Sequence, residues 1–293
     1  MLKHHCPSPI SPSRVVIVGA GGFIGAAAAG RLIARGVEVI AITRQDIDLL
    51  SGGAAGQLAV ILRDNDTLVL IAAQAPVKNN AMLIDNLRMA AAVCAAISSI
   101  KVAHVIYVSS DAVYADSDRP LNESSCAHPA SLHGVMHLAR EVMLAEVCKA
   151  PLCILRPTLI YGANDPHNGY GPNRFRRLAQ RGEEIGLFGA GEELRDHVYI
   201  DDVAEIIVRS VVHKSQGILN IATGTVTSFL DVAKKAAALT PRTLTIKNTE
   251  RSGPMPHRGY RAFDPSATAR AFPDFCYTPL EVGLALSQKQ EFH

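Results

Sequence analysis

The sequence predicts an α/β fold, a doubly wound (Rossmann) parallel sheet with a smaller, discontinuous substrate-binding lobe. From Val15 onward, apolar strand-like runs alternate with helical patterns, which is typical of parallel strands joined by covering helices. The first of these runs ends in a glycine-rich turn that opens the first helix. After Tyr161 the alternation weakens, which indicates a second and less regular part of the chain.

The predicted strands are apolar throughout, because parallel strands are buried on both faces of the sheet. They cover Val15–Val18, Val37–Ile42, Thr67–Ala72, His104–Val108 and Leu152–Leu155, and a short strand follows at Leu219–Ala222. The predicted helices cover Phe23–Ala34, Leu58–Arg63, Asn80–Ser98, His133–Lys149 and Arg174–Arg181, and a further helix ends at Val212. Gly, Asn and Pro between residues 162 and 173 predict a loop.

These elements predict a tail followed by two domains. Residues 14–165 form a dinucleotide-binding Rossmann domain that also receives about 197–222, and residues 166–293 form most of the substrate-binding lobe. Residues 1–13 are rich in Pro and Ser and lack the apolar segment of a signal peptide, so they predict a disordered tail.

Composition excludes several classes of function. The formal net charge is +2, the basic residues are scattered and there is no Trp, so no nucleic-acid partner is predicted. Apolar runs stay shorter than the ~18 residues of a membrane-spanning helix, so no membrane association is predicted. The six cysteines form no CxxC pair, which favours a reducing, cytoplasmic location.

The glycine turn predicts a dinucleotide site. Gly19, Gly22 and Gly25 lie directly between a strand and a helix, where the lack of side chains lets the backbone approach a pyrophosphate. The start of the helix offers N–H groups to the phosphates. The second strand ends in Thr43-Arg44, where an NAD-binding chain carries an acidic residue for the ribose hydroxyls. A hydroxyl and a guanidinium suit a 2′-phosphate, so the predicted cofactor is NADP, with NAD as the alternative.

Further motifs follow along the chain. They are Asp48-Leu49, Ala72-Ala73-Gln74, Asn86, VSSDAVY at 108–114, LRP at 155–157, IYG at 160–162, RDHVYIDDVA at 195–204 and NIATG at 220–224. Together with the glycine turn, this series resembles the extended short-chain dehydrogenase/reductase family, the group of NAD(P)-dependent nucleotide-sugar epimerases, dehydratases and reductases. The resemblance runs from Val15 to about Gly283.

The resemblance implies cofactor contacts and a substrate site. The cofactor-binding positions are Gly19, Gly22, Phe23, Ile24, Gly25, Thr43, Arg44, Asp48, Leu49, Ala72, Ala73, Gln74 and Ser109, together with His133 and His137. The substrate-binding positions are Ser110, Asp111, Asn173 and Arg195, of which Arg195 meets the diphosphate of a nucleotide sugar. The resemblance also implies that Asn86 opens the long helix, and that a homodimer forms through the helices at 80–98 and 133–149.

The family's catalytic Tyr-xxx-Lys motif is absent from this chain. Its flanking residues are present at Pro129, Gly134 and Glu141, and they place His133 at the tyrosine position and His137 at the lysine position. A histidine exchanges protons near neutral pH because its unperturbed pKa is ~6.5. His133 is therefore predicted to replace the tyrosine as the catalytic acid/base.

The two histidines leave several interpretations open. In the first, His133 moves the proton, His137 binds a hydroxyl of the nicotinamide ribose and Ser110 polarises the substrate carbonyl. In the second, the i, i+4 spacing of the histidines ligates zinc, but the sequence shows no third ligand, and no metal site is predicted. In the third, catalysis has been lost and both rings fill the site.

The first hypothesis is therefore an NADP-dependent oxidoreductase or epimerase that acts on a nucleotide-activated sugar. Ala112 follows Asp111 where the family's dehydratases carry Glu, which favours reduction or epimerisation over dehydration. The alternative is a catalytically silent dinucleotide-binding protein that senses redox state through partner contacts. Both hypotheses include cofactor binding, and proton transfer by His133 distinguishes them.

Overall fold

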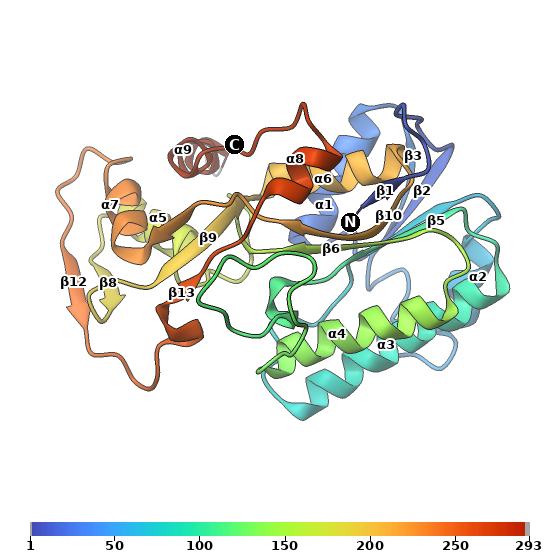
Figure 1. Ribbon diagram of the computed structural model, residues 1–293, viewed down its shortest axis with the longest axis horizontal. Helices are drawn as coiled ribbons and strands as arrows, with labels where there is room; N and C mark the ends of the chain where they lie inside the picture. Colours follow the sequence, from blue (N-terminus) through green and yellow to red (C-terminus); the bar gives the residue numbers. More distant parts are fainter. Residues whose placement is uncertain (1, 291–293) are drawn as a thin grey trace.

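A sheet of seven strands forms the centre of the structure (Figure 1). The computed structural model describes residues 2–290, so Met1 of the predicted tail and residues 291–293 of the predicted lobe lie outside the described residues. Across the sheet the order is β1 (Lys3–His4), β10 (Ser215–Ile221), β6 (Leu152–Pro157), β5 (His104–Val108), β4 (Thr67–Leu70), β2 (Arg14–Val18) and β3 (Glu38–Ile42). All neighbours pair in parallel except β1 and β10, so the predicted doubly wound α/β fold is confirmed.

Helices cover both faces of this sheet. One face carries α1 (Phe23–Ala34) and α6 (Ile200–Val212), and the other carries α2 (Ala54–Ile61), α3 (Asn80–Ser99) and α4 (Leu132–Val147) (Figure 1). Alternate strand residues enter opposite cores, since Val15 and Ile17 pack with α1 and α6 whereas Val16 and Val18 pack with α2 and α3. Both faces are buried, which is why these strands are apolar throughout.

A smaller lobe begins where β6 ends, because only Thr158 separates β6 from β7. Its strands are β7 (Leu159–Tyr161), β9 (Leu194–Tyr199), β11 (Val226–Ser228) and β13 (Tyr260–Arg261), with β8 (Ile185–Phe188) and β12 (Ile246–Thr249) as a separate pair. Its helices are α5 (Pro172–Arg181), α7 (Phe229–Ala237) and α9 (Leu280–Gln290), while α8 (Ser266–Ala271) packs on β10. The lobe is discontinuous, because α6 and β10 return to the large sheet between β9 and β11 (Figure 1).

The segment predicted to be a disordered tail is ordered in the structure. Residues 3–4 form β1, which pairs antiparallel with β10, and the His4 ring makes hydrogen bonds to Ser215 Oγ and to the Ala271 carbonyl, both 2.9 Å long. The backbone nitrogen of Ile10 donates to the Val212 carbonyl at 2.9 Å. β10 otherwise ends the sheet, and an unpaired edge strand offers hydrogen-bonding groups to any extended segment. The structure therefore corrects the prediction of disorder, which composition alone suggested.

The helix α3 differs from its prediction at one position. It begins at Asn80, so Asn86 lies in its second turn rather than opening it. The fully buried Asn86 carboxamide accepts a hydrogen bond from the backbone nitrogen of Gln74 (2.9 Å) and donates to its carbonyl oxygen (3.0 Å), which fixes the loop after β4. Within residues 2–290, α3 alone has the length and composition of a membrane span, but it packs between α2 and α4 on the sheet.

Candidate functional site

The glycine turn after β2 has a backbone that requires glycine. Gly19 has a φ of +99°, and a Cβ at this position would lie 2.5 Å from the backbone nitrogen of Ala72. A Cβ at Gly25 would collide with the carbonyl oxygen of Gly19. The turn therefore lets the chain run from strand to helix with no side chain in the space that a pyrophosphate needs.

The start of α1 completes this turn. Gly22 is the N-cap residue and offers no side chain to cap the helix, and the first turn, which includes Phe23 and Ile24, contains no acidic residue. The N–H groups of this turn and the positive end of the helix dipole are thus available to phosphate oxygens. The residues present fit a dinucleotide.

Gly19→Ala is expected to weaken NADPH binding by about tenfold or more and to lower the free energy of unfolding by about 1–2 kcal/mol. The reason is that an alanine is strained at φ +99° and its methyl group must displace the backbone at Ala72. Isothermal titration calorimetry and urea unfolding measure the two effects. Gly30→Ala is the matched control within α1, because no atom lies within 4 Å of the added Cβ. An unchanged affinity of the Gly19 variant would contradict a dinucleotide site at this turn.

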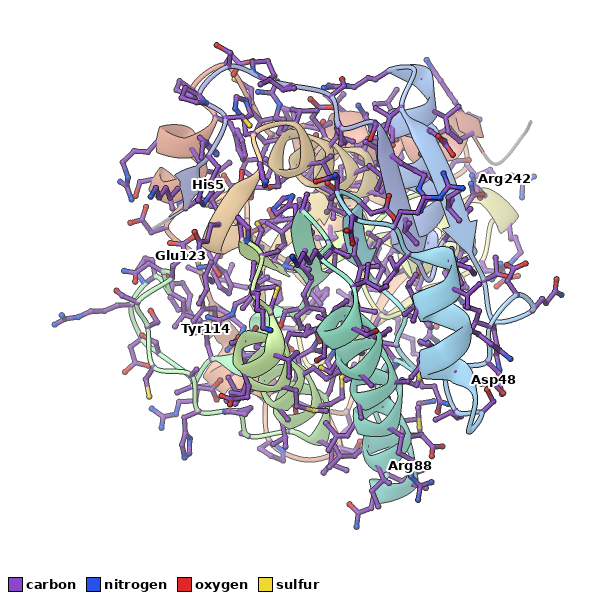
Figure 2. The ribbon with its side chains drawn as sticks, turned by 90° about the vertical axis from the view of Figure 1, so that its right-hand side faces the viewer. His5, Asp48, Arg88, Tyr114, Glu123 and Arg242 are labelled. Carbon is purple, nitrogen blue, oxygen red and sulfur yellow. The ribbon has the colours of Figure 1, made fainter. Side chains whose placement is uncertain are left out.

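The end of β3 presents the residues predicted to select the cofactor. The Arg44 side chain is 76% exposed, and its guanidinium lies 3.7 Å from the carboxylate of Asp48. Asp46 accepts hydrogen bonds from the backbone nitrogen (2.8 Å) and the hydroxyl (2.7 Å) of Thr43, and these bonds lower the pKa of its carboxyl group. Figure 2 shows Asp48 at the molecular surface, whereas the adjacent Leu49 is buried in the core. The Thr43 hydroxyl is therefore engaged within this loop, whereas the Arg44 guanidinium is exposed to solvent.

The loop after β4 forms a wall beside the glycine turn. It contains Ala72, Ala73 and Gln74. The backbone nitrogen of Ala72 donates to the carbonyl oxygen of Val18 at 2.9 Å, which holds the loop against the turn. The next two residues of the chain, 75–76, line the cavity that lies beyond this wall.

A cavity of about 420 Å³ opens at the carboxyl ends of β4, β5 and β6. Its lining residues are Ala75, Pro76, Ser110, Asp111, Ala112, His133, Thr158, Leu159, Ile160, His167, Arg195, Asp196, His257, Arg261 and Phe263. Four of the predicted site residues are thus brought together in one place: Ser110, Asp111, His133 and Arg195. The carboxyl ends of the strands are where parallel α/β sheets bind ligands.

The two histidines lie one turn apart on α4, with their rings edge to face and the centroids 4.7 Å apart. His133 lines the cavity, and because its Nδ1 is buried without a hydrogen-bond partner, Nε2 is the nitrogen left to face a substrate. His137 is buried behind it, and its Nδ1 lies 2.8 Å from the hydroxyl of Tyr107. Burial lowers the pKa of both rings, partly offset at His133 by Asp111 and reinforced at His137 by His133. Both rings are therefore neutral at pH 7.

Ser110 lines the cavity at the start of η1, a short 3-10 helix at Asp111–Val113. Its hydroxyl oxygen accepts a hydrogen bond from the backbone nitrogen of Ala112 (3.1 Å), and its proton has only a long, 3.4 Å contact with Asp111. A contact of that length is weak. The hydroxyl proton can therefore be redirected to a substrate oxygen without loss of a strong bond.

Arg195 and Arg261 both line the cavity, and the sequence predicted only the first. Arg195 donates from Nε to Glu193 at 2.7 Å and pairs through NH2 with the same carboxylate, and its NH1 group makes no hydrogen bond with another residue of the range 2–290. Arg261 is buried and donates from Nε to Asp111 at 2.7 Å, with His257 beside it in the short segment η2 (Pro256–Gly259), where His257 itself has a positive φ of 51°. No local motif marks Arg261 or His257. The parallel pairing of β13 with β9 carries them to the cavity.

Ser109 and Asn173 were predicted to bind cofactor and substrate, but their side chains have structural partners instead. The Ser109 hydroxyl donates to Glu141 at 2.5 Å within the core. The buried Asn173 carboxamide accepts from the backbone nitrogen of Gly162 (3.0 Å) and donates to Asp165 (2.9 Å), which fixes the loop after β7. Neither residue lines the cavity, and in this structure both side chains stabilise the scaffold. Their contacts with cofactor and substrate stay predictions.

The parallel sheet, its glycine turn and the adjacent cavity are typical of dinucleotide-binding proteins of the Rossmann class. Residues 15–222 match the model of the NAD dependent epimerase/dehydratase family, and the chain belongs to this family. The resemblance found in the sequence is thereby confirmed.

Individual relatives agree with this assignment. The chain is 29% identical over 221 residues to the 2-alkyl-3-oxoalkanoate reductase of Shewanella oneidensis, a match that covers 66% of this chain and 55% of that protein. The chain thus spans about half the length of this curated relative. Its fold matches UDP-glucose 4-epimerase from Thermus thermophilus in complex with NAD, with a TM-score of 0.82, 20% identity and 95% and 99% of the two chains covered. It matches a GDP-L-fucose synthetase from Naegleria fowleri bound to NADP equally well, with a TM-score of 0.82, 17% identity and 98% and 96% covered.

Proposed function

We propose that this protein is an NADP-dependent oxidoreductase or epimerase that acts on a nucleotide-activated sugar, with His133 as the acid/base. The observation that carries the proposal is the position of His133 and Ser110 in one cavity at the carboxyl ends of the strands, next to the glycine turn. A bound nicotinamide supplies or accepts the hydride. The residues of the chain have to move the proton and hold the substrate.

The proton step is assigned to His133. Its ring lines the cavity, the buried Nδ1 leaves Nε2 as the nitrogen available to a substrate, and burial lowers the pKa of the ring, which favours the neutral form at pH 7. A neutral ring accepts the proton of a substrate hydroxyl during oxidation and returns it during reduction. The Ser110 hydroxyl donates to the same substrate oxygen and polarises it.

Substrate binding is assigned to Arg195 and Arg261. Both guanidinium groups line the cavity, and each is oriented by carboxylates, Glu193 in one case and Asp111 with Asp116 in the other. A guanidinium has five N–H donors. Arg195 has Glu193 as its one carboxylate partner and keeps donors for a phosphate. The Nε, NH1 and NH2 groups of Arg261 already have partners in Asp111, Asp116, His257 and the Tyr114 carbonyl, so Arg261 contributes positive charge at the cavity wall. A preoriented arginine with free donors beside a second positive charge suits a diphosphate, which is the group that we expect a nucleotide-sugar substrate to present.

The decisive experiment combines binding with turnover. We expect NADPH to bind more tightly than NADH in calorimetry, and a panel of nucleotide sugars to support hydride transfer measured by absorbance at the nicotinamide band. A 2-alkyl-3-oxoalkanoate serves as the competing substrate class, chosen for the relative in Shewanella oneidensis. Turnover of the oxoalkanoate without any nucleotide sugar would overturn the substrate assignment, and absence of dinucleotide binding would overturn the whole proposal.

Cofactor selection is expected to depend on Arg44. Arg44→Ala should weaken NADPH binding by about tenfold, because an exposed charge-assisted contact to the 2′-phosphate is lost, and should leave NADH binding unchanged. Calorimetry with both cofactors measures the two affinities. Arg88→Ala is the matched control, since Arg88 is a similarly exposed arginine on α3 (Figure 2). Equal losses for both cofactors would show that Arg44 does not read the 2′-phosphate.

The cytoplasmic location and the homodimer stay predictions of the sequence. The helices implied in dimerisation, α3 and α4, lie side by side on one face of the sheet (Figure 1). Their exposed apolar side chains are Ile84, Val135 and Val142. Sedimentation of the purified protein would measure its oligomeric state.

A further inference from the structure

Arg140 on α4 carries a buried positive charge without a counter-charge. Its side chain is fully buried, and within residues 2–290 no carboxylate forms an ion pair with it. NH2 donates to the carbonyl oxygen of Ala72 (2.8 Å), NH1 contacts the sulfur of Met136 (3.7 Å), and Nε has no partner. Arg156, which is also buried, is instead paired with Glu141. An unpaired buried ion is costly, so Arg140 needs a reason other than stability.

The position of Arg140 suggests that reason. It lies on the same side of α4 as the two histidines, seven residues after His133 and three after His137. Its guanidinium lies 5.2 Å from the centre of the Tyr107 ring. The Tyr107 hydroxyl in turn meets His137 Nδ1 at 2.8 Å, and His137 contacts His133. A row of contacts therefore runs from the buried cation to the wall of the cavity.

We propose that Arg140 is the positioning residue of the histidine pair: its fixed charge, buried beside Tyr107, holds His137 as the neutral tautomer that presents Nε2–H to a bound dinucleotide. The proposal rests on the proposed function, since it assumes a nicotinamide ribose next to His137.

The charges around the row support a neutral His137. Its pKa lies well below the ordinary value because of burial, the neighbouring His133 and the charge of Arg140. Burial raises the pKa of Tyr107 to about 12 although Arg140 opposes it, so the phenol keeps its proton. The proposal assigns this proton to the 2.8 Å hydrogen bond with His137, in which Nδ1 accepts. The proton of His137 then resides on Nε2. The other ionisable groups that face this row are Glu141, Asp111 and Cys94.

Arg140 also contacts the cofactor site itself. The carbonyl oxygen that it binds belongs to Ala72, whose backbone nitrogen is the nearest atom to a Cβ built at Gly19. One side chain thus fixes both the wall of the glycine turn and the orientation of His137. Loss of the Arg140 charge is expected to change the tautomer and pKa of His137. Loss of its hydrogen bond to Ala72 is expected to loosen the loop beside the glycine turn.

The test compares Arg140→Met, which removes the charge, with Arg140→Lys, which keeps it. ¹⁵N and ¹³C NMR of histidine-labelled protein without cofactor reports the tautomer and pKa of His137, and His137→Gln assigns the resonances. In the wild type we expect an Nε2–H tautomer whose pKa lies below the ordinary value of about 6.5. In Arg140→Met we expect a raised pKa and a mixture of tautomers, with NADPH binding weakened on the order of tenfold. Arg140→Lys should keep the wild-type tautomer.

The controls separate this inference from the proposed function. Met136→Leu removes the sulfur contact of Arg140 but keeps its charge, so the His137 resonances should stay as in the wild type. Arg140→Gln repeats the uncharged test if the methionine variant does not fold. An unchanged tautomer and pKa of His137 in the uncharged variants would overturn the role of Arg140. Failure of the wild type to bind NADPH would overturn the proposed function and leave the NMR result intact.

Discussion

His133→Ala is expected to lower kcat by about 10²–10⁴-fold, the usual contribution of a general acid/base. The affinity for NADPH should stay close to that of the wild type, because the glycine turn and Arg44 lie on other elements. Steady-state turnover of the best nucleotide sugar measures the first quantity, and calorimetry measures the second. A histidine that only fills space would give a small and equal change in both.

The pH dependence of turnover provides a second readout of the same assignment. Burial lowers the pKa of His133 from its ordinary value of about 6.5. Oxidation needs the neutral ring as a base, so kcat/KM in that direction should rise as the pH increases through this pKa and stay flat above about pH 6.5. Reduction needs the protonated ring as an acid, so kcat/KM should fall across the same range. The residual activity of His133→Ala should show neither the rise nor the fall of kcat/KM with pH.

Two other histidines provide controls for the assignment of His133 as the acid/base. His128→Ala changes an exposed histidine outside the cavity and should leave turnover unchanged. His257 does line the cavity, so His257→Ala tests the competing proton donor. If His257→Ala abolishes the pH dependence of kcat/KM and His133→Ala does not, the acid/base is His257. If the wild type binds NADPH but transfers no hydride to any substrate tested, the catalytically silent alternative is favoured, and His133→Tyr with His137→Lys should then restore activity.

The sequence predicted those features that depend on contiguous residues. The glycine turn is one example, since Gly22 and Gly25 are constrained by contacts with Gly19 in the same turn, although Gly19 itself is constrained by the distant Ala72. The positions of His133 and His137 were found in the same way, from their flanking residues. The fold also followed, because burial on both faces imposes apolar strands. Each of these features depends on residues that are close together along the chain, so it can be predicted from a single sequence.

The remaining parts depend on contacts between distant segments. Arg261 reaches the cavity only because β13 pairs with β9, a partner about 65 residues away along the chain. Ser109 follows the family motif, but whether its hydroxyl faces the cofactor or the core depends on Glu141 of α4. β1 is ordered only because β10 leaves an edge for it. Such outcomes require the fold to be known first.

The Ser109 contact belongs to a buried network that lies beneath the site. Glu141 accepts hydrogen bonds from Nε (2.9 Å) and NH2 (2.5 Å) of Arg156, as well as from Ser109 (2.5 Å). The Arg156 guanidinium also lies over the Tyr114 ring, 4.8 Å from its centre. All of these residues belong to motifs of the family resemblance, yet none of them lines the cavity. Their role is to hold β5, β6 and α4 together behind Ser110.

Removing one partner of the buried Arg156–Glu141 ion pair is expected to destabilise the protein more than any other substitution proposed above. Arg156→Met leaves the Glu141 carboxylate buried with Ser109 as its remaining partner, and should lower the free energy of unfolding by about 3–5 kcal/mol, measured by urea denaturation. The double variant Arg156→Met with Glu141→Leu removes both charges and should recover most of the loss. The two variants are expected to differ because the loss of stability comes mainly from burying the Glu141 carboxylate without a partner, and less from losing the attraction between the two charges. If the double variant is as unstable as the single one, Arg156 acts through Tyr114 and packing instead of through Glu141.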